Sequence, residues 1–161
     1  MELYFLRHGE AGFNAPSDFE RVLTVGGEQA ALNVGKFCAE SSVIFTRVLT
    51  SPLVRAKQTA HCVMQELPDT VIEECEFLTP DSDPRNLLEH LRSYSTDSRL
   101  LLVTHEPFVS TCISSLISGS ETVNIQMKPA TLVLIETSGV PASGNGRVRW
   151  ILPPSVIEAL L

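Results

Sequence analysis

The sequence is short of positive charge, and this shortage argues against one large class of function. Its 161 residues include 12 lysines and arginines against 19 aspartates and glutamates, which gives a formal net charge of −7. Nucleic-acid binding usually needs a basic face, so we expect no nucleic-acid partner. Any anion site must be a local cluster of arginines within an acidic surface, and such a contrast selects anionic groups sharply.

The cysteines form no recognisable pattern. They are widely separated and include no CxxC pair: Cys38, Cys62, Cys75 and Cys112. We interpret them as reduced thiols rather than a disulfide framework. The histidines and cysteines also lack the spacing of a zinc site, so the sequence predicts no metal centre.

Long apolar runs are missing as well. No stretch approaches the roughly 20 residues that span a membrane, and the apolar run 3–6 is too short for a signal peptide and has no basic region before it. We therefore expect a cytoplasmic protein without membrane contact. Its hydrophobic content of 43% is that of a globular protein. Without repeats or an apolar surface stripe, we expect a single domain over 1–161 and a monomer.

Short apolar runs alternate with segments of helical spacing. The expected strands are 2–6, 43–50, 71–76, 99–104, 131–137 and 147–152. The expected helices are 27–40, 53–67, one around Leu87, Leu88 and Leu91, and 107–117. Continuous apolar runs are typical of strands that are covered on both faces. The order predicts an α/β fold, a three-layer α/β/α sandwich with a mostly parallel central sheet.

Turn and cap signals mark several boundaries. Ser51-Pro52 reads as an N-cap followed by proline at the first helical position, and Asp83-Pro84 has the same pattern. The segment 138–146 is rich in glycine, proline and serine, which predicts a loop between two late strands.

Polar residues follow three of the expected strands. Arg7-His8-Gly9 follows the first, Ser51-Pro52 with Arg55 follows the second, and Thr104-His105-Glu106 follows 99–104. Ligands of such sheets bind where the strands end. Arg55 falls near a helix N-terminus, which already favours an anion, and its planar fork suits two phosphoryl oxygens. Singly, each residue is most often structural; their occurrence in order predicts a phosphate site.

The chemistry of this set is that of phosphoryl transfer. Arginines beside His8 are expected to lower its pKa, which leaves a neutral imidazole that can attack phosphorus. Arg7 and Arg55 would neutralise the phosphoryl oxygens, so neither metal nor cofactor is required. Gly9 would allow a tight turn close to the ligand.

At these positions the sequence resembles the histidine phosphatase superfamily, the phosphoglycerate-mutase-like phosphatases. The matching strings are Leu6-Arg7-His8-Gly9-Glu10, Leu23-Thr24 with Gly27, Ser51-Pro52-Leu53-Val54-Arg55-Ala56-Lys57-Gln58-Thr59, and Val103-Thr104-His105-Glu106. The resemblance implies the phosphoglycerate-mutase-like fold with minimal insertions. It also implies that His8 is the phospho-accepting nucleophile and that Arg7, Arg55 and His105 complete the phosphate pocket.

The same resemblance suggests further residues around the phosphate. Asn14 falls where many members carry a phosphate-contacting asparagine, whereas Ala11 departs from the serine often found at its position. Gly9, Thr24 and Arg21 are further candidates for phosphate or substrate binding, although Arg21 is by default a surface arginine. The candidate general acids are Asp18 and Glu106.

The short chain most resembles the bacterial SixA-type phosphohistidine phosphatases. It lacks the longer insertion after the second helix that shapes the pocket of mutases and acid phosphatases. We therefore expect an open groove that admits a histidine-phosphorylated protein, either a histidine-containing phosphotransfer (HPt) domain of a sensor kinase or a phosphocarrier. A small-molecule phosphomonoesterase and a non-catalytic phosphohistidine-binding module remain the alternatives.

Overall fold

A computed structural model describes residues 1–161. A single mixed sheet of six strands runs through the molecule in the order β3-β2-β4-β1-β5-β6. The strands are β1 (Glu2–Arg7), β2 (Arg47–Thr50), β3 (Ile72–Glu74), β4 (Arg99–Thr104), β5 (Leu132–Thr137) and β6 (Gly146–Leu152). The helices are α1 (Val25–Glu40), α2 (Val54–Met64), α3 (Pro84–Leu91), α4 (Phe108–Ser118) and α5 (Pro154–Leu160), with a 3-10 turn η1 (Glu76–Leu78).

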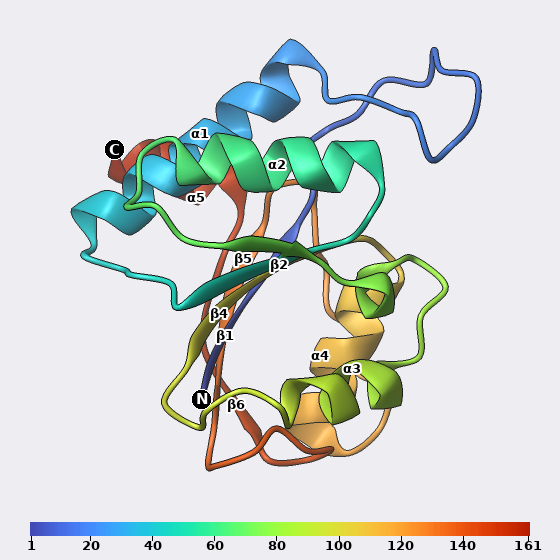
Figure 1. The fold of residues 1–161 in the computed structure, drawn as a ribbon, viewed down its shortest axis with the longest axis vertical. Coiled ribbons are helices and arrows are strands. Elements are labelled where there is room, and N and C mark those ends of the chain that lie inside the picture. Colours follow the sequence, from blue (N-terminus) through green and yellow to red (C-terminus); the bar gives the residue numbers. More distant parts are fainter.

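The helices cover both faces of the sheet, as the three-layer prediction requires (Figure 1). Alternation along β1 explains why, because successive side chains of a strand point to opposite faces. Leu3 and Phe5 join the core on the side of α3 and α4. Tyr4 and Leu6 join the core on the side of α1, α2 and α5. The α/β class is thereby confirmed.

The sheet is parallel in its first four strands and antiparallel in its last two. β3 pairs with β2, β2 with β4, and β4 with β1, all in parallel. β5 is antiparallel to both β1 and β6. The loop 138–145 explains the last pair, since a connection this short joins antiparallel neighbours only. The prediction of a loop there is confirmed.

Several boundaries differ from the sequence prediction. The cap at Asp83 is confirmed, since its carboxylate accepts from the Arg85 backbone. The cap at Ser51 is wrong: α2 begins at Val54 after Leu53, and no side chain caps it. η1 and α5 were not predicted, and β3 is shorter than expected because the chain turns into η1. None of the helices combines the length and apolar character needed to cross a bilayer.

Candidate active site

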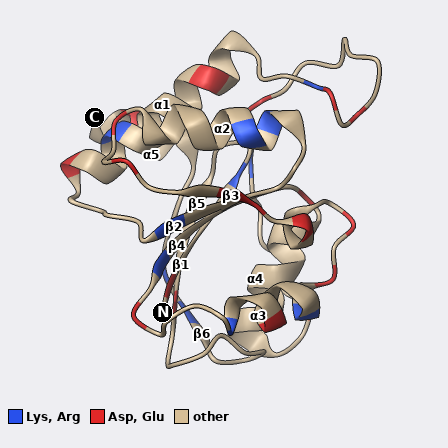
Figure 2. Cartoon of the chain, in the orientation of Figure 1, with Lys and Arg blue, Asp and Glu red and all other residues tan.

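The three polar turns meet at one edge of the sheet. The parallel register places Arg7 beside Thr104 at the ends of β1 and β4. The backbone N–H of His8 donates to the carbonyl of Thr104 over 2.9 Å, and that of Ser51 donates to the carbonyl of Val103 over 3.0 Å. In Figure 2 the basic positions at the end of β1 and at the start of α2 lie close together. The edge therefore gathers His8, the two arginines and His105.

His8 is a buried imidazole whose two ring nitrogens both have a hydrogen-bond partner. The residue is 8% exposed. Nδ1 lies 2.6 Å from the carbonyl oxygen of Gly9, and Nε2 lies 3.2 Å from Nε of Arg55. A carbonyl only accepts and a guanidinium only donates, so the proton belongs on Nδ1 and the lone pair on Nε2.

The pKa of His8 is lowered to about 4, and the direction of this shift agrees with the sequence prediction. The cause differs from the prediction. Burial is the largest contribution, because it penalises the charged ring, and the charges of Arg55 and Arg7 add to it. The hydrogen bond to Gly9 opposes the shift. His8 is therefore neutral over the whole physiological pH range.

His105 is the second buried imidazole of the site. Its ring centroid lies 4.9 Å from that of His8, and its Nε2 lies 2.8 Å from the hydroxyl oxygen of Ser51. Nδ1 is buried without a hydrogen-bond partner. Burial, followed by the charges of His8 and Arg55, lowers the pKa of His105 to about 3. A neutral ring with one unpartnered nitrogen thus lies beside His8.

Arg7 is held by the segment that precedes β5. Its Nη1 donates to the carbonyl of Met127 over 2.6 Å. Its backbone carbonyl accepts from Ala130, which has a left-handed backbone with φ of 59°, and its backbone N–H donates to Thr131. Nε of Arg7 is buried without a partner. Burial lowers the pKa of Arg7, while Glu106 raises it. The free donor on Nε suits an anion beside His8.

Arg55 is the second residue of α2 and is held by Asp18. Nη1 of Arg55 donates to the backbone carbonyl of Asp18 over 2.6 Å, and Nη2 donates to its Oδ2 over 3.0 Å. Arg21 donates to Oδ1 over 3.0 Å. The hydrogen bond from Arg21, aided by Arg55, lowers the pKa of Asp18. Asp18 is therefore an ionised carboxylate here, which accepts hydrogen bonds and has no proton to give.

Of three other candidates, Asn14 and Thr24 lie on or beside the loop that precedes α1, and Gly9 adjoins His8. The side chain of Asn14 is exposed on the loop 11–24 and makes no hydrogen bond. Thr24 caps α1, since its hydroxyl accepts from the backbone of Gly27 over 3.0 Å. Gly9 is in close contact with α1: an added Cβ would lie 2.5 Å from the carbonyl oxygen of Gly27.

Glu106, the other candidate acid, is half-buried at the start of the turn after β4. Its Oε2 accepts from the hydroxyl of Ser110 over 2.7 Å. It lines a cavity of about 660 Å³ together with Arg7, Ser110, Asn124 and Gln126. Of the residues gathered at the sheet edge, Arg7 lines this cavity.

Sequence reasoning missed several supporting residues. The hydroxyl of Thr59 accepts from the backbone of Gly9 over 3.0 Å, and the amide oxygen of Gln58 accepts from Leu23 over 2.8 Å. Both belong to the string 51–59, so the motif already contained them, although without a role. The carbonyl of Met127 had no signal at all, since a backbone acceptor is independent of residue type.

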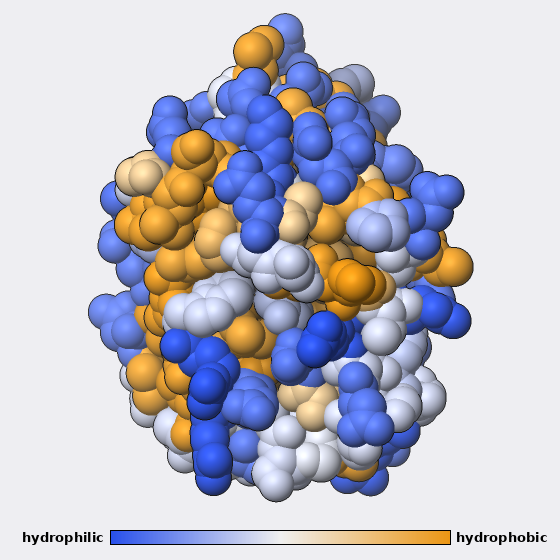
Figure 3. Space-filling model, turned by 90° about the vertical axis from the view of Figure 1, so that its left-hand side faces the viewer, coloured by the Kyte–Doolittle hydropathy of each residue, from blue (hydrophilic) through white to orange (hydrophobic).

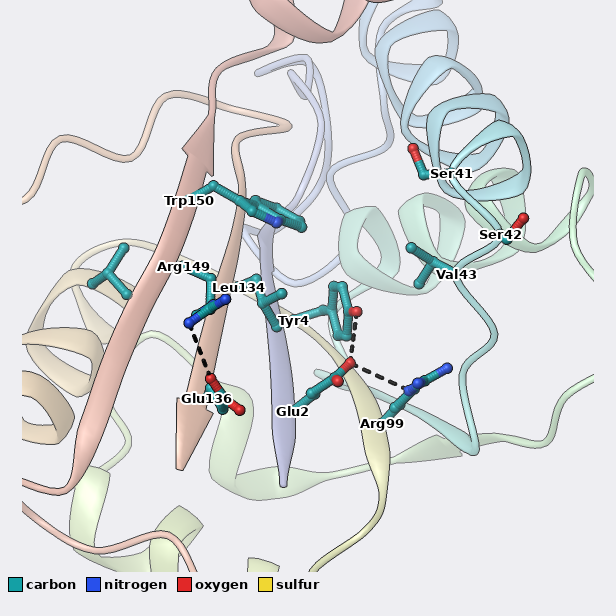
Figure 4. A pocket seen from close by; sticks show the side chains of 11 residues that line it. Glu2, Tyr4, Ser41, Ser42, Val43, Arg99, Leu134, Glu136, Arg149 and Trp150 are labelled. Carbon is teal, nitrogen blue, oxygen red and sulfur yellow. Dashed lines mark hydrogen bonds and ion pairs between the residues drawn. The ribbon is translucent and has the colours of Figure 1, made fainter. Parts of the chain in front are cut away.

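A second cavity, of about 500 Å³, lies on the α1 side of the sheet, near the C-terminal end of α1 (Figure 4). Its charged groups are paired with one another: Arg99 with Glu2 at 3.3 Å and Arg149 with Glu136 at 3.5 Å. The hydroxyl of Tyr4 also donates to Glu2. A cavity whose charges are already neutralised offers little to a phosphoryl group. No group of three or more histidine, cysteine, aspartate or glutamate side chains is placed to hold a metal ion.

Comparisons with known proteins agree with this geometry. The family model described as the histidine phosphatase superfamily (branch 1) matches residues 3–78. The phosphohistidine phosphatase SixA of Escherichia coli (strain K12) is 28% identical over 158 residues, which cover 96% of this chain and 94% of that protein. The chain belongs to the histidine phosphatase superfamily.

Two further comparisons also cover nearly the whole chain. An uncharacterized protein of Picosynechococcus is 30% identical over 165 residues, covering 95% of this chain and all of that one. The solved structure of the protein histidine phosphatase SixA complexed with tungstate superposes with a TM-score of 0.87 at 26% identity, covering 96% and 98% of the two chains. This superfamily member is thus a phosphatase with the phosphoglycerate-mutase-like fold.

Proposed function

We propose that this protein removes phosphoryl groups from histidine-phosphorylated proteins, either HPt domains or phosphocarriers, through a phosphohistidine intermediate on His8. The observation that carries the proposal is the state of His8. The ring is neutral, with Nδ1 hydrogen-bonded to the carbonyl of Gly9 and the lone pair on Nε2. Nε of Arg55 lies 3.2 Å from Nε2. A buried neutral imidazole beside two guanidinium groups is a nucleophile next to an anion site.

The reaction then has two steps. Nε2 of His8 attacks phosphorus as the P–N bond of the substrate breaks, and the departing imidazole takes up a proton from solvent water. Water next attacks the phosphoryl group on Nε2, which releases inorganic phosphate and restores His8. Arg7 and Arg55 stabilise the charge on the phosphoryl oxygens, and the neutral ring of His105 donates a hydrogen bond. The related SixA structure is complexed with tungstate, an oxyanion, which supports oxyanion binding by this fold.

The state of Asp18 favours phosphohistidine over a phosphate ester. An alkoxide is a poor leaving group and needs a proton from a well-placed acid. The pKa of Asp18 is lowered by Arg21 and Arg55, so it is a poor donor of that proton. A protonated imidazole, by contrast, leaves as a neutral molecule. A site with an ionised carboxylate at this position suits the P–N bond.

The short connection between α2 and β4 supports a protein substrate. Only β3, η1 and α3 lie between these elements. No long insertion closes over the sheet edge, so a phosphohistidine on another protein's surface can approach it. The related protein of E. coli is named a phosphohistidine phosphatase, which points to the same substrate class.

The experiment is phosphate release from a histidine-phosphorylated HPt domain, run beside p-nitrophenyl phosphate. We expect rapid release from the HPt domain and little from the ester. His8→Ala is expected to lower kcat by at least about a thousandfold, as loss of a nucleophile does. His61→Ala is the matched control, because His61 is exposed on α2 and its side chain hydrogen-bonds to the backbone carbonyl of Lys57.

The other outcomes select the alternatives. Preference for the ester would assign a small-molecule phosphomonoesterase. Binding of the phosphorylated HPt domain without turnover would assign a phosphohistidine-binding module.

We also propose that residues 1–161 act as one domain, as a monomer in the cytoplasm. The single sheet and the two cores that share it support one folding unit. All the cysteines are free thiols, and three of them are buried, which fits a reducing compartment. One unfolding transition and a monomer mass in light scattering are the expected results.

A further inference from the structure

The loop 11–24 exposes apolar side chains next to the candidate active site. Phe13 is 87% exposed and Phe19 is 47% exposed, and they are the only aromatic side chains among the exposed large hydrophobic residues. Val22 on the same loop and Val25 at the start of α1 are also exposed. In Figure 1 this loop, in blue between β1 and α1, projects beyond the N-terminal end of α2. Exposed aromatic residues in a cluster mark binding surfaces more often than isolated apolar residues do.

The exposure of Phe13 results from a defined loop geometry. The backbone of Gly12 donates to the carbonyl of Val22 over 2.9 Å, and Ala11 forms a bridge with Leu23. The guanidinium of Arg21 stacks on the Phe13 ring, 4.2 Å from its centroid. The loop is therefore closed at its base, and the ring is held outward against a cation.

A chain of contacts connects this ring to the nucleophile. Arg21, which stacks on Phe13, donates to the carboxylate of Asp18. Asp18 holds Arg55, and Arg55 donates to Nε2 of His8. The aromatic surface and the phosphate site are thus parts of one continuous arrangement.

Phe19 is fixed to the same place by its backbone. Its carbonyl accepts from the N–H of Val54, the first residue of α2, over 3.2 Å. Arg55 follows directly in the sequence. Both aromatic residues therefore lie on the rim from which a substrate reaches the catalytic histidine.

Other exposed apolar residues lack this connection. Figure 3 shows the side on which α1 ends, where apolar side chains gather between hydrophilic ones. β6 and α5 carry exposed Val148, Ile151 and Val156, but none of these contacts the network of Arg55 and His8. Exposure alone does not identify a docking surface; continuity with the site does.

We propose that Phe13 and Phe19 form the docking surface for the phosphorylated protein, and that they contact apolar side chains beside its phosphohistidine. This inference rests on the proposed function. A phosphohistidine on a protein is presented with its neighbouring side chains, so those neighbours meet the rim of the site while the phosphoryl group meets the arginines. Free phosphohistidine has no such neighbours and would use the phosphate site alone.

The test compares these two substrates, a histidine-phosphorylated HPt domain and free phosphohistidine. For Phe13→Ser and Phe19→Ser we expect kcat/KM on the HPt domain to fall about tenfold, mainly through KM, as truncation of an interface aromatic does. Turnover of free phosphohistidine should stay within about twofold of wild type, as expected for a site left intact. Ile44→Ser is the matched control. Ile44 is 57% exposed and precedes the start of β2, at the opposite end of the strands from the site.

The opposing outcomes are distinct from one another. An unchanged kcat/KM on the HPt domain overturns the docking surface while wild-type turnover upholds the proposed function. Equal losses on both substrates also overturn it and assign Phe13 to the positioning of Arg21. If the wild type is a dimer and the Phe13→Ser variant is a monomer, the docking surface is overturned and its occupant is a second copy of the chain. A wild type inactive on both substrates refutes the proposed function itself.

Discussion

The hydroxyl oxygen of Ser51 lies 2.8 Å from Nε2 of His105. It also accepts weakly from the backbone of Leu53 over 3.4 Å, so its own proton is available for the ring. A hydrogen bond from Ser51 to Nε2 leaves the ring proton on Nδ1, the nitrogen that has no partner. Phosphoryl oxygens only accept, so this tautomer is the one that can donate to them. We therefore predict that Ser51 positions His105 by fixing this tautomer, without contacting the substrate.

Replacing Ser51 should reduce turnover more than binding. For Ser51→Ala we expect kcat to fall on the order of ten- to a hundredfold, as when other groups that orient a functional histidine are removed. Steady-state kinetics on a phosphorylated HPt domain measure this, and Ser51→Thr should restore part of kcat. The control is Ser114→Ala, which removes another buried hydroxyl, remote in α4, and should keep kcat. An unchanged kcat in Ser51→Ala would contradict the tautomer argument.

Asp18 should prove dispensable as a proton donor. Its pKa is lowered by Arg21 and Arg55, so the carboxyl carries no proton at neutral pH. Asp18→Asn keeps an acceptor oxygen for Arg55 and the backbone carbonyl that holds Nη1. We expect kcat on the phosphorylated HPt domain to change by less than about tenfold, whereas loss of a general acid costs about a hundred- to ten-thousandfold. A loss in that larger range, with Glu106→Gln unaffected, would show that Asp18 is the acid after all.

The site was predictable where its residues follow strands, and hidden where they act through the backbone. His8, Arg55 and His105 each follow an apolar run, and parallel strands end at a common edge, so their meeting follows from the pattern. The continuous apolar run of β1 predicted a strand covered on both faces, and its side chains do enter both cores.

Contacts that depend on tertiary structure were not predictable. Ser51 before a proline looks like a helix cap, and only the position of His105 gives its hydroxyl another partner. The hydrogen bond from Nη1 of Arg7 to Met127 uses the backbone carbonyl of Met127, a group that every residue has. The main cause of the shifted pKa of His8 was likewise hidden, since burial is a property of the folded chain and the neighbouring arginines are visible in the sequence.

The lowered pKa of His8 should appear in the pH dependence of stability. The folded-state pKa is about 4, and the unfolded value is about 6.5. Below pH 6.5 the unfolded chain binds a proton that the folded chain does not, so stability is lost as the pH falls from about 6.5 to about 4 and the loss stops below that. The full loss from His8 is on the order of 3 kcal/mol.

Urea unfolding of wild type and His8→Gln across this pH window measures the effect. The variant should lose less stability than wild type on acidification, because it no longer has the proton to take up. His61→Gln, at an exposed position, should follow the wild-type curve. Parallel curves for wild type and His8→Gln would contradict a depressed pKa.

Two adjacent glycines of α1 should respond in opposite ways to alanine. A Cβ on Gly27 would lie 2.1 Å from the carbonyl oxygen of Glu10 and 2.8 Å from its nitrogen, so the helix must move away from the turn that carries His8. On Gly26 the nearest atoms would be 3.8 Å away, which is ordinary contact. Gly27→Ala is therefore expected to lower the free energy of unfolding by at least about 1–3 kcal/mol, the usual cost of overpacking, and to lower kcat as well.

Gly26→Ala should instead keep kcat and leave stability unchanged or raise it by up to about 1 kcal/mol, since alanine is the better helix former and this position is exposed. Urea unfolding at neutral pH and turnover of a phosphorylated HPt domain measure both variants. Equal behaviour of the two would mean that the turn after β1 yields without cost. The contact between Gly27 and Glu10 would then have no part in placing His8 over the end of the sheet.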